Sequence, residues 1–252
     1  MDLRLNGKCA LITGATAGIG EAAAKLFAAE GVKLVLNGRR EDALKSLAAE
    51  IAATGAPNPV IVAGALDSAD ASAEVTHAAL DAAGGEIDIL FNNAGASNPL
   101  KDPWDEVEWE ASLKLNFAAA RQVTAAIVPG MQARKWGRII NTTGAMVTPV
   151  PNAAIPAKAA LQSWSRSLSI QLAPDGITVN TIAPGRIDTA QIRNNVHPTP
   201  ESRQAFIDKF IPTGHFGQPE DLAVLAVFLA SPLAGYINGA AIPVDGAMLR
   251  IS

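Results

Sequence analysis

The chain contains few of the residues from which disulfide frameworks and metal sites are built. Its 252 residues include one cysteine, three histidines and one tyrosine, and aromatic residues make up only 5%. A single cysteine excludes an internal disulfide framework, and the scattered histidines show no metal-ligand spacing. We therefore predict no metal site, and we interpret Cys9 as a small buried residue of the first expected strand.

Charge and long apolar runs are also scarce. Charged residues make up 17%, and the net charge of -4 excludes the broad basic surface typical of proteins that bind nucleic acid or anionic membranes. No apolar run is long enough to span a bilayer, and the first residues lack the apolar core of a signal peptide. These absences predict a cytoplasmic protein that binds neither nucleic acid nor membrane.

Apolar residues are abundant at 49%, enough for one large core in a single domain over 1–252. Short apolar runs alternate with alanine-rich segments, which predicts an α/β fold. Seven apolar strands separated by helices indicate a mostly parallel, doubly wound sheet with helices on both faces. Strands are expected at 8–13, 32–37, 59–63, 87–91, 138–143, 177–183 and 241–244, and helices at 19–30, 41–54, 69–83, 104–135, 155–173 and 219–230.

The longest irregular stretch, roughly 185–218, is rich in proline, asparagine and threonine. A connection of that length inside a compact domain is typical of a lid or binding loop, so we predict a substrate lid near 186–217. Its histidine His197 is a candidate acid, because imidazole titrates near neutral pH.

A glycine-rich turn follows the first expected strand, with the sequence Thr-Gly-Ala-Thr-Ala-Gly-Ile-Gly over 13–20. Gly14 permits the turn, Gly18 lets the backbone approach a pyrophosphate, and Gly20 lets the helix pack closely on the strand. The first amides and the dipole of that helix favour a negatively charged ligand. The pattern favours dinucleotide binding, and the alternative is a glycine-rich turn without a ligand.

Three further motifs lie where other expected strands end. Asn92-Asn93-Ala94-Gly95 follows the fourth strand, Lys158 opens the helix after the fifth, and Pro184-Gly185 follows the sixth. Open α/β sheets bind their ligands at this edge. Together with the glycine turn, these motifs resemble the short-chain dehydrogenase/reductase superfamily, in particular members similar to 3-oxoacyl-acyl-carrier-protein reductases. The resemblance covers essentially the whole chain, and it implies a Rossmann fold, an oxidoreductase and a homotetramer.

The resemblance also implies roles for single residues. The glycine turn would hold the pyrophosphate, Asp67 the adenine amino group, Lys158 the nicotinamide ribose, and the stretch 184–189 the carboxamide. Alternatives are a helix-capping role for Asp67 and a surface position for Lys158. The implied cofactor-binding residues are Gly14, Thr16, Gly18, Ile19, Gly20, Asp67, Asn93, Ala94, Gly95, Lys158, Pro184, Gly185, Ile187 and Thr189.

The end of the second expected strand indicates the choice of cofactor. Sites that select NAD place an acidic residue there, whereas this chain has no carboxylate before Glu41. A guanidinium offers forked donors to a 2′-phosphate. We therefore favour NADP(H), with NAD(H) as the alternative, and assign the phosphate contact to Arg39 first and Arg40 second. Both arginines could instead be solvated residues at the start of the next helix.

The chain departs from the family pattern at the catalytic residues. The family tyrosine precedes the lysine by four positions, where this chain has Ala154, and the one tyrosine, Tyr236, lies far along the chain. The expected serine position is occupied by Gly144 or Asn141, depending on the direction of counting, which implies a shortened loop. Thr143 or Thr142 could supply a hydroxyl there. The catalytic candidates are Lys158, Asn116 and Thr143.

These observations predict an NADP(H)-dependent oxidoreductase that acts on a small carbonyl or alcohol substrate with a non-standard proton donor. Two alternatives remain. One is a catalytically silent dinucleotide-binding homologue that serves as a sensor or structural subunit. The other is a lyase or dehydratase that reuses the pocket.

Overall fold

The computed structural model describes residues 1–97, 99–144 and 151–248. Seven strands form one sheet in the order β3-β2-β1-β4-β5-β6-β7, and every neighbouring pair is parallel. The predicted doubly wound α/β fold is therefore confirmed. The strands are β1 (Cys9–Ile12), β2 (Lys33–Gly38), β3 (Val60–Ala63), β4 (Ile89–Asn92), β5 (Gly137–Thr142), β6 (Ile177–Pro184) and β7 (Ala241–Val244).

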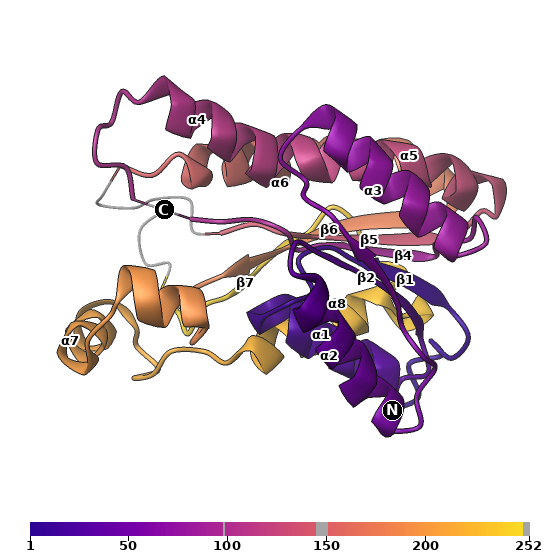
Figure 1. Ribbon diagram of the computed structural model, residues 1–252, viewed down its shortest axis with the longest axis horizontal. Helices are drawn as coiled ribbons and strands as arrows, with labels where there is room; N and C mark the ends of the chain where they lie inside the picture. Colours follow the sequence, from indigo (N-terminus) through magenta and orange to yellow (C-terminus); the bar gives the residue numbers. More distant parts are fainter. Residues whose placement is uncertain (98, 145–150, 249–252) are drawn as a thin grey trace.

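Helices cover both faces of the sheet, as Figure 1 shows. One layer contains α1 (Gly18–Ala29), α2 (Glu41–Ala53) and α8 (Pro219–Ala230). The opposite layer contains α3 (Ala69–Ala82), α4 (Glu106–Leu113), α5 (Ala119–Ala133) and α6 (Ala154–Leu172). Two short 3-10 turns, η2 (Ala173–Asp175) and η4 (Pro232–Ala234), follow α6 and α8.

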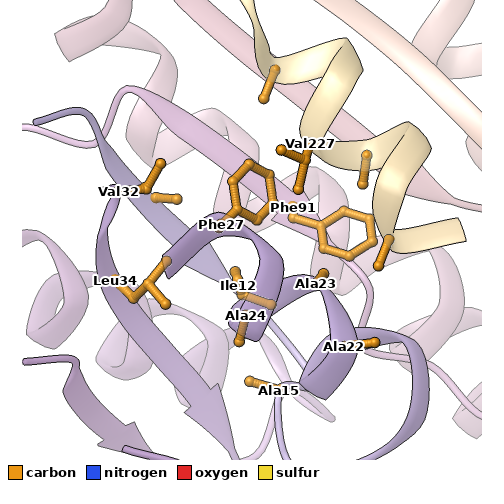
Figure 2. Packing of buried hydrophobic residues seen from close by; sticks show 14 of the residues in the cluster. Ile12, Ala15, Ala22, Ala23, Ala24, Phe27, Val32, Leu34, Phe91 and Val227 are labelled. Carbon is orange, nitrogen blue, oxygen red and sulfur yellow. The ribbon is translucent and has the colours of Figure 1, made fainter. Parts of the chain in front are cut away.

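Alanine allows the helices to lie close to the sheet. In Figure 2, Phe27 of α1 and Phe91 of β4 fill the space between the sheet and α8, where Val227 closes the cluster. The inward face of α1 is otherwise built from small residues such as Ala23 and Ala24, which are fully buried. A second cluster, beneath α3, α5 and α6, covers the other face of the sheet. These two cores fix the strand ends that carry the predicted motifs.

The direction in which successive strands are added to the sheet reverses at β1, because β2 lies on one side of β1 and β4 on the other. In open α/β sheets this reversal opens a crevice at the carboxyl ends of the strands, because successive crossovers leave on opposite faces. The glycine turn after β1 and the Asn93–Gly95 segment after β4 both begin at this point.

The single helix expected over 104–135 is divided into α4, a π-helical segment η1 (Lys114–Ala118) and α5. Asn116 lies at the centre of η1, and its side-chain amide donates to the Ser112 carbonyl oxygen at 3.1 Å. Such a side-chain bond to the preceding turn competes with the regular backbone ladder, and π segments accommodate the extra residue. The hydrophobic pattern alone does not register a one-residue insertion of this kind.

The predicted lid contains regular structure that the sequence interpretation treated as irregular. A π-helical turn η3 (Ile192–Val196) is followed by α7 (Pro200–Phe210), which projects to one side of the two helical layers in Figure 1. Thr199 caps α7 by accepting a bond from the Ser202 amide at 3.1 Å, and Pro200 occupies the first helical position. This capping pattern was present in the sequence and marks the start of the helix.

Candidate active site at the carboxyl edge of the sheet

The turn after β1 has the conformation that its glycines permit. Gly14 and Gly18 have φ angles of +67° and +58°, in the left-handed region where a side chain is strained. A Cβ added at Gly20 would lie 2.2 Å from the Gly14 carbonyl oxygen, so any side chain at position 20 would clash with the turn. Ala17, the residue before α1, makes no side-chain cap, which leaves the first amides of α1 for another acceptor.

Thr13 and Asn93 tie this turn to the end of β4. The Thr13 hydroxyl oxygen accepts from the Asn93 and Ala94 amides at 3.0 and 3.1 Å. The Asn93 side chain in turn donates to the Thr13 and Gly14 carbonyl oxygens at 3.3 and 3.2 Å. The described role of Asn93 is therefore to hold the two strand ends together. Its implied role in cofactor binding stays a prediction.

The two arginines after β2 lie in different surroundings. Arg40 donates from Nη2 to the Thr16 carbonyl oxygen at 3.0 Å, so its guanidinium is held against the glycine turn. Arg39 is exposed, and no hydrogen bond or ion pair within the described residues involves its guanidinium. Glu41, the first carboxylate after the strand, forms an ion pair with Lys45 at 2.7 Å. Within the described residues, Arg39 is therefore the only cationic side chain at the end of β2 that forms neither a hydrogen bond nor an ion pair.

Asp67 lies at the rim of a hollow of about 460 Å³ between the loop after β3 and helix α4. Its side chain is exposed, and it lies before the capping residue Ser68 of α3 and does not itself cap the helix. The alternative of a helix-capping role for Asp67 is thus wrong. The hollow is lined by Asp67, Glu106, Val107, Glu110, Ala111, Lys114 and Leu115.

Lys158, Asn116 and Gly95 meet at the carboxyl edge of the sheet. A Cβ added at Gly95 would lie 2.8 Å from Asn116 Oδ1 and 2.9 Å from Lys158 Nζ, so both polar atoms lie against one backbone position. Lys158 is buried on α6, and its Nζ donates to the Thr142 carbonyl oxygen at 2.7 Å. Burial lowers the pKa of Lys158 to about 8, because desolvation disfavours the charged amine. The alternative of a surface lysine is wrong.

Asn116 uses its side chain to hold the loop after β4. Its Oδ1 accepts from the Ala96 amide at 3.1 Å, and its Nδ2 donates to the Ala96 carbonyl oxygen at 3.0 Å. The π segment η1 brings this side chain toward the loop. Asn116 therefore links α4 and α5 to the backbone that lies beside Lys158.

Ala154 and Thr143 occupy the positions where the resemblance places the tyrosine and a hydroxyl donor. Ala154 is the first residue of α6 and is buried, one helical turn before Lys158. The Thr143 hydroxyl donates to the Ile182 carbonyl oxygen at 3.2 Å, so its proton is directed at β6. The loop between Gly144 and Ala154, which the sequence predicts to be shortened, falls partly on residues 145–150, which lie outside the described residues.

The stretch after β6 lies against the glycine turn. Thr189 Cγ2 is 2.9 Å from where a Cβ of Gly18 would lie, and Ile187 forms a β-bridge with Gly217. Gly185 lies against the backbone of Asp245, where a Cβ would be 2.6 Å from the Asp245 Cα. The stretch where the predicted lid begins and the predicted pyrophosphate turn are thus direct neighbours.

A sequence model of the family described as enoyl-(acyl carrier protein) reductase matches residues 14–248. The chain belongs to this family. D-beta-hydroxybutyrate dehydrogenase of Cupriavidus necator is 34% identical over 255 residues, which cover 96% of this chain and 98% of the relative. A 3-oxoacyl-(acyl-carrier-protein) reductase of Vibrio cholerae is 34% identical over 254 residues, which cover 99% and 100%.

Solved structures agree with these relatives. L-sorbose reductase from Gluconobacter frateurii, determined with NADPH and L-sorbose, superposes with a TM-score of 0.92 at 32% identity, over all of both chains. The predicted membership of the short-chain dehydrogenase/reductase superfamily, whose named members here are dehydrogenases and reductases, is confirmed.

Three residues of this short-chain dehydrogenase/reductase chain were not singled out in the sequence. Asn152 Oδ1 accepts from the Ala154 amide at 3.0 Å, and Asn152 Nδ2 donates to the Ser97 hydroxyl at 2.9 Å. Gln191, at the base of the lid, donates to the Ser97 carbonyl oxygen at 3.2 Å. No motif marks these residues. Only the fold brings the lid, the loop after β4 and the start of α6 together beside Ala154.

Within the described ranges 1–97, 99–144 and 151–248, no group of three or more histidine, cysteine, aspartate or glutamate side chains is arranged to hold a metal ion. Over the same ranges, no helix combines the length and apolar character needed to cross a bilayer.

Proposed function

We propose that the protein is an NADP(H)-dependent oxidoreductase that interconverts a small carbonyl compound and its alcohol, with Lys158 as the proton donor. The observation that carries this proposal is the convergence of Lys158 Nζ and Asn116 Oδ1 on Gly95, at the sheet edge where the glycine turn ends. Membership of a dehydrogenase and reductase family supports the same reaction class.

The residues present fit a dinucleotide. The turn at Gly14, Gly18 and Gly20 forms a cradle that side chains would fill, and its helix amides make no side-chain cap. The hollow beside Asp67, of about 460 Å³, has the volume to hold a planar base. These features support binding of the pyrophosphate at the turn and of the adenine at Asp67, with Lys158 at the nicotinamide ribose.

The arginine after β2 supports NADP(H) over NAD(H). Arg39 is exposed and uncommitted among the described residues, while Glu41 is paired with Lys45 and offers no free carboxylate to a ribose hydroxyl. A guanidinium binds a 2′-phosphate through forked donors. The contact is expected to contribute about 1.5–3 kcal/mol, the scale of a charged hydrogen bond.

NADPH supplies, when bound, the hydride for reduction of a carbonyl carbon. Lys158 then supplies the proton that the carbonyl oxygen takes up during the reduction. Its pKa of about 8 makes it a stronger acid than an ordinary lysine, and Ala154 places no phenol between the amine and the substrate. The bond to the Thr142 carbonyl uses one of the three Nζ protons. The other two can face a substrate oxygen or a water held beside Asn116.

The absence of the phenol has a cost. Loss of a positioned general acid typically lowers a rate by about 10²–10⁴, or roughly 3–5.5 kcal/mol of barrier. The second candidate is a silent cofactor-binding homologue. It is favoured because Ala154 is buried and carries no phenol, and because the Thr143 hydroxyl is already bonded to the Ile182 carbonyl oxygen. A lyase or dehydratase is disfavoured, because a reaction that needs no nicotinamide has no use for the intact glycine turn.

The test combines binding and turnover. Calorimetry with NADPH and NADH should show tighter binding of NADPH, and Arg39→Ala should reduce that preference. Consumption of NADPH is then followed across aldehydes, ketones, imines and enones for the parent and for Lys158→Met. Turnover that Lys158→Met abolishes supports the oxidoreductase. Binding without turnover on any substrate favours the silent homologue, and no binding of either nucleotide removes both.

A further inference from the structure

The lid contains an aromatic cluster around two nitrogen-bearing side chains. Phe206 of α7 lies at its centre, with ring centroids 4.8 Å from Phe210 and 6.3 Å from Phe216. The His197 ring lies 4.6 Å from Phe206 and 5.6 Å from Phe216. Lid helices need apolar residues to pack, but packing alone does not require an imidazole or a guanidinium in the cluster.

Arg186 enters this cluster from the end of β6. It follows Gly185, and its guanidinium carbon lies 4.7 Å from the centre of the Phe206 ring. Its Nε is buried without a hydrogen-bond partner among the described residues, and none of their carboxylates forms an ion pair with it. Burial lowers the pKa of the guanidinium. A half-buried cation without a counterion is costly, and stacking on one ring offsets only part of that cost.

His197 presents a second buried nitrogen without a partner within the described ranges, its Nε2. Burial, followed by the positive charges of Arg186 and Arg203, lowers the pKa of His197 and so disfavours its protonated form. A neutral imidazole still donates from one ring nitrogen. The lowered pKa argues against His197 as the protonated acid suggested by the sequence, and it leaves His197 as a hydrogen-bond donor.

The acidic residue nearest to Arg186 in sequence, Asp188, already has a cationic partner. Asp188 forms an ion pair with Arg193 at 3.0 Å, on the exposed side of the same segment. Arg203 donates to the His197 carbonyl oxygen at 3.5 Å and adds positive charge to the cluster. Within the described residues, the charges that act on His197 are therefore positive, and no carboxylate forms an ion pair with Arg186.

We propose that Arg186 and His197 bind the carboxylate of the substrate, which makes the substrate an oxo acid or hydroxy acid. A guanidinium edge meets the two oxygens of a carboxylate in one plane, and the single negative charge is matched by Arg186 alone. The position suits such a role, because Arg186 lies in the same stretch as Ile187 and Thr189, which contact Gly217 and the Gly18 region. This inference rests on the proposed oxidoreductase function and specifies its substrate class.

The experiment uses the complete chain saturated with NADP⁺, because an oxo compound and the oxidised cofactor form a complex that cannot turn over. Calorimetry compares each acid with its neutral amide, acetoacetate with acetoacetamide and pyruvate with pyruvamide. Three variants are compared with the parent. Arg186→Met keeps the side-chain length without the charge, and His197→Phe keeps the ring without the donor. Arg193→Met is the matched control, since that guanidinium is already paired with Asp188.

In the parent, at least one acid should bind about 10-fold or more tightly than its amide. Arg186→Met should reduce that ratio to near one, His197→Phe should reduce it in part, and Arg193→Met should preserve it. A purely structural role of Arg186 would lower thermal stability and leave the ratio unchanged. An unchanged ratio in Arg186→Met, or acids that bind no better than amides to the parent, would overturn the inference. Failure of NADP⁺ itself to bind would instead count against the proposed function.

Discussion

At Lys158, the energetic cost of burial and the chemistry of the amine have the same origin. Removal from water disfavours the charged form and lowers the pKa to about 8, while the Thr142 carbonyl oxygen accepts a hydrogen bond from the amine and holds it in place. A surface lysine would be more stable in the fold but would be a weaker acid. Residues at functional sites often lower stability in this way.

The first prediction concerns the pH dependence that this burial imposes on stability. Between about 8 and 10.5 the unfolded chain binds the Lys158 proton more strongly than the folded chain, so the free energy of unfolding should rise with pH across that window. The rise corresponds to roughly 3 kcal/mol. Lys158→Met should lack it, and should be more stable than the parent below pH about 8. Urea unfolding of both proteins at several pH values measures the difference, and parallel pH profiles would show that Lys158 is not desolvated in the fold.

The second prediction concerns Ala154, where a phenol can be restored. Ala154→Tyr places a hydroxyl near Lys158, and the ammonium lowers the pKa of the phenol. Because Ala154 is buried, the added ring should cost about 1–3 kcal/mol of stability. Ketone reduction, followed by NADPH consumption, should increase in part, and further with Thr143→Ser, whose hydroxyl rotates more freely than that of threonine. Ala154→Phe adds the same bulk without the hydroxyl, so an equal increase in that variant would exclude a phenol effect.

At the scale of elements, the sequence was informative wherever one physical rule determines the outcome. Continuous apolar runs predicted all seven strands, and β7 begins and ends as expected. Alanine-rich periodicity predicted the helices, but it could not locate the π segment at Asn116, because periodicity does not reveal the side-chain bond from Asn116 to the Ser112 carbonyl oxygen. The lid helix α7 was missed because its capping residues were interpreted as loop composition.

The candidate site shows the same division. Its glycines and Lys158 could be found from the sequence, because their positions at the ends of strands follow from the alternation of elements. The approach of Arg186 to His197 could not be found, because the two residues meet only through the packing of both side chains on Phe206. The links between Ser97, Asn152 and Gln191 also depend on tertiary contacts.

The third prediction tests the turn between β1 and α1 as a unit. Alanine within a helix is normally favoured over glycine by about 1 kcal/mol, but at Gly20 its methyl group would meet the Gly14 carbonyl oxygen at 2.2 Å. The clash should dominate, and Gly20→Ala should lose measurable NADPH binding by calorimetry. Gly55→Ala is the control. Gly55 has φ of +81° and open space around its Cβ position, so this change should cost about 1–2 kcal/mol of stability and leave NADPH affinity intact.

At the scale of the whole molecule, the topology of the sheet determines where the site forms. Residues from positions as distant in sequence as Gly14, Gly95, Lys158 and Thr189 meet because parallel strands end at one edge, on both sides of the reversal at β1. The helical layers hold that edge in place, and the segment predicted to be a lid, with α7, extends from it (Figure 1).

The outer helices are the expected site of association between whole molecules. On the layer formed by α4, α5 and α6, the large apolar side chain of Ile170 exposes 73% of its surface, and we expect a partner chain to cover it. The family resemblance implies a homotetramer through these helices and the C-terminal segment. Part of that segment, 249–252, lies outside the described residues.

The fourth prediction is therefore that the protein is a homotetramer in solution. Light scattering at micromolar concentration should give the mass of four chains of 26.0 kDa each. Ile170→Glu should lower that mass, because a charge buried in an apolar interface without a partner is strongly unfavourable. Val60→Glu changes an exposed apolar residue of the edge strand β3, on a different part of the molecule, and should leave the assembly intact. A monomer mass for the parent would refute the tetramer. Equal effects of the two variants would show that added charge, and not this helical layer, controls the association.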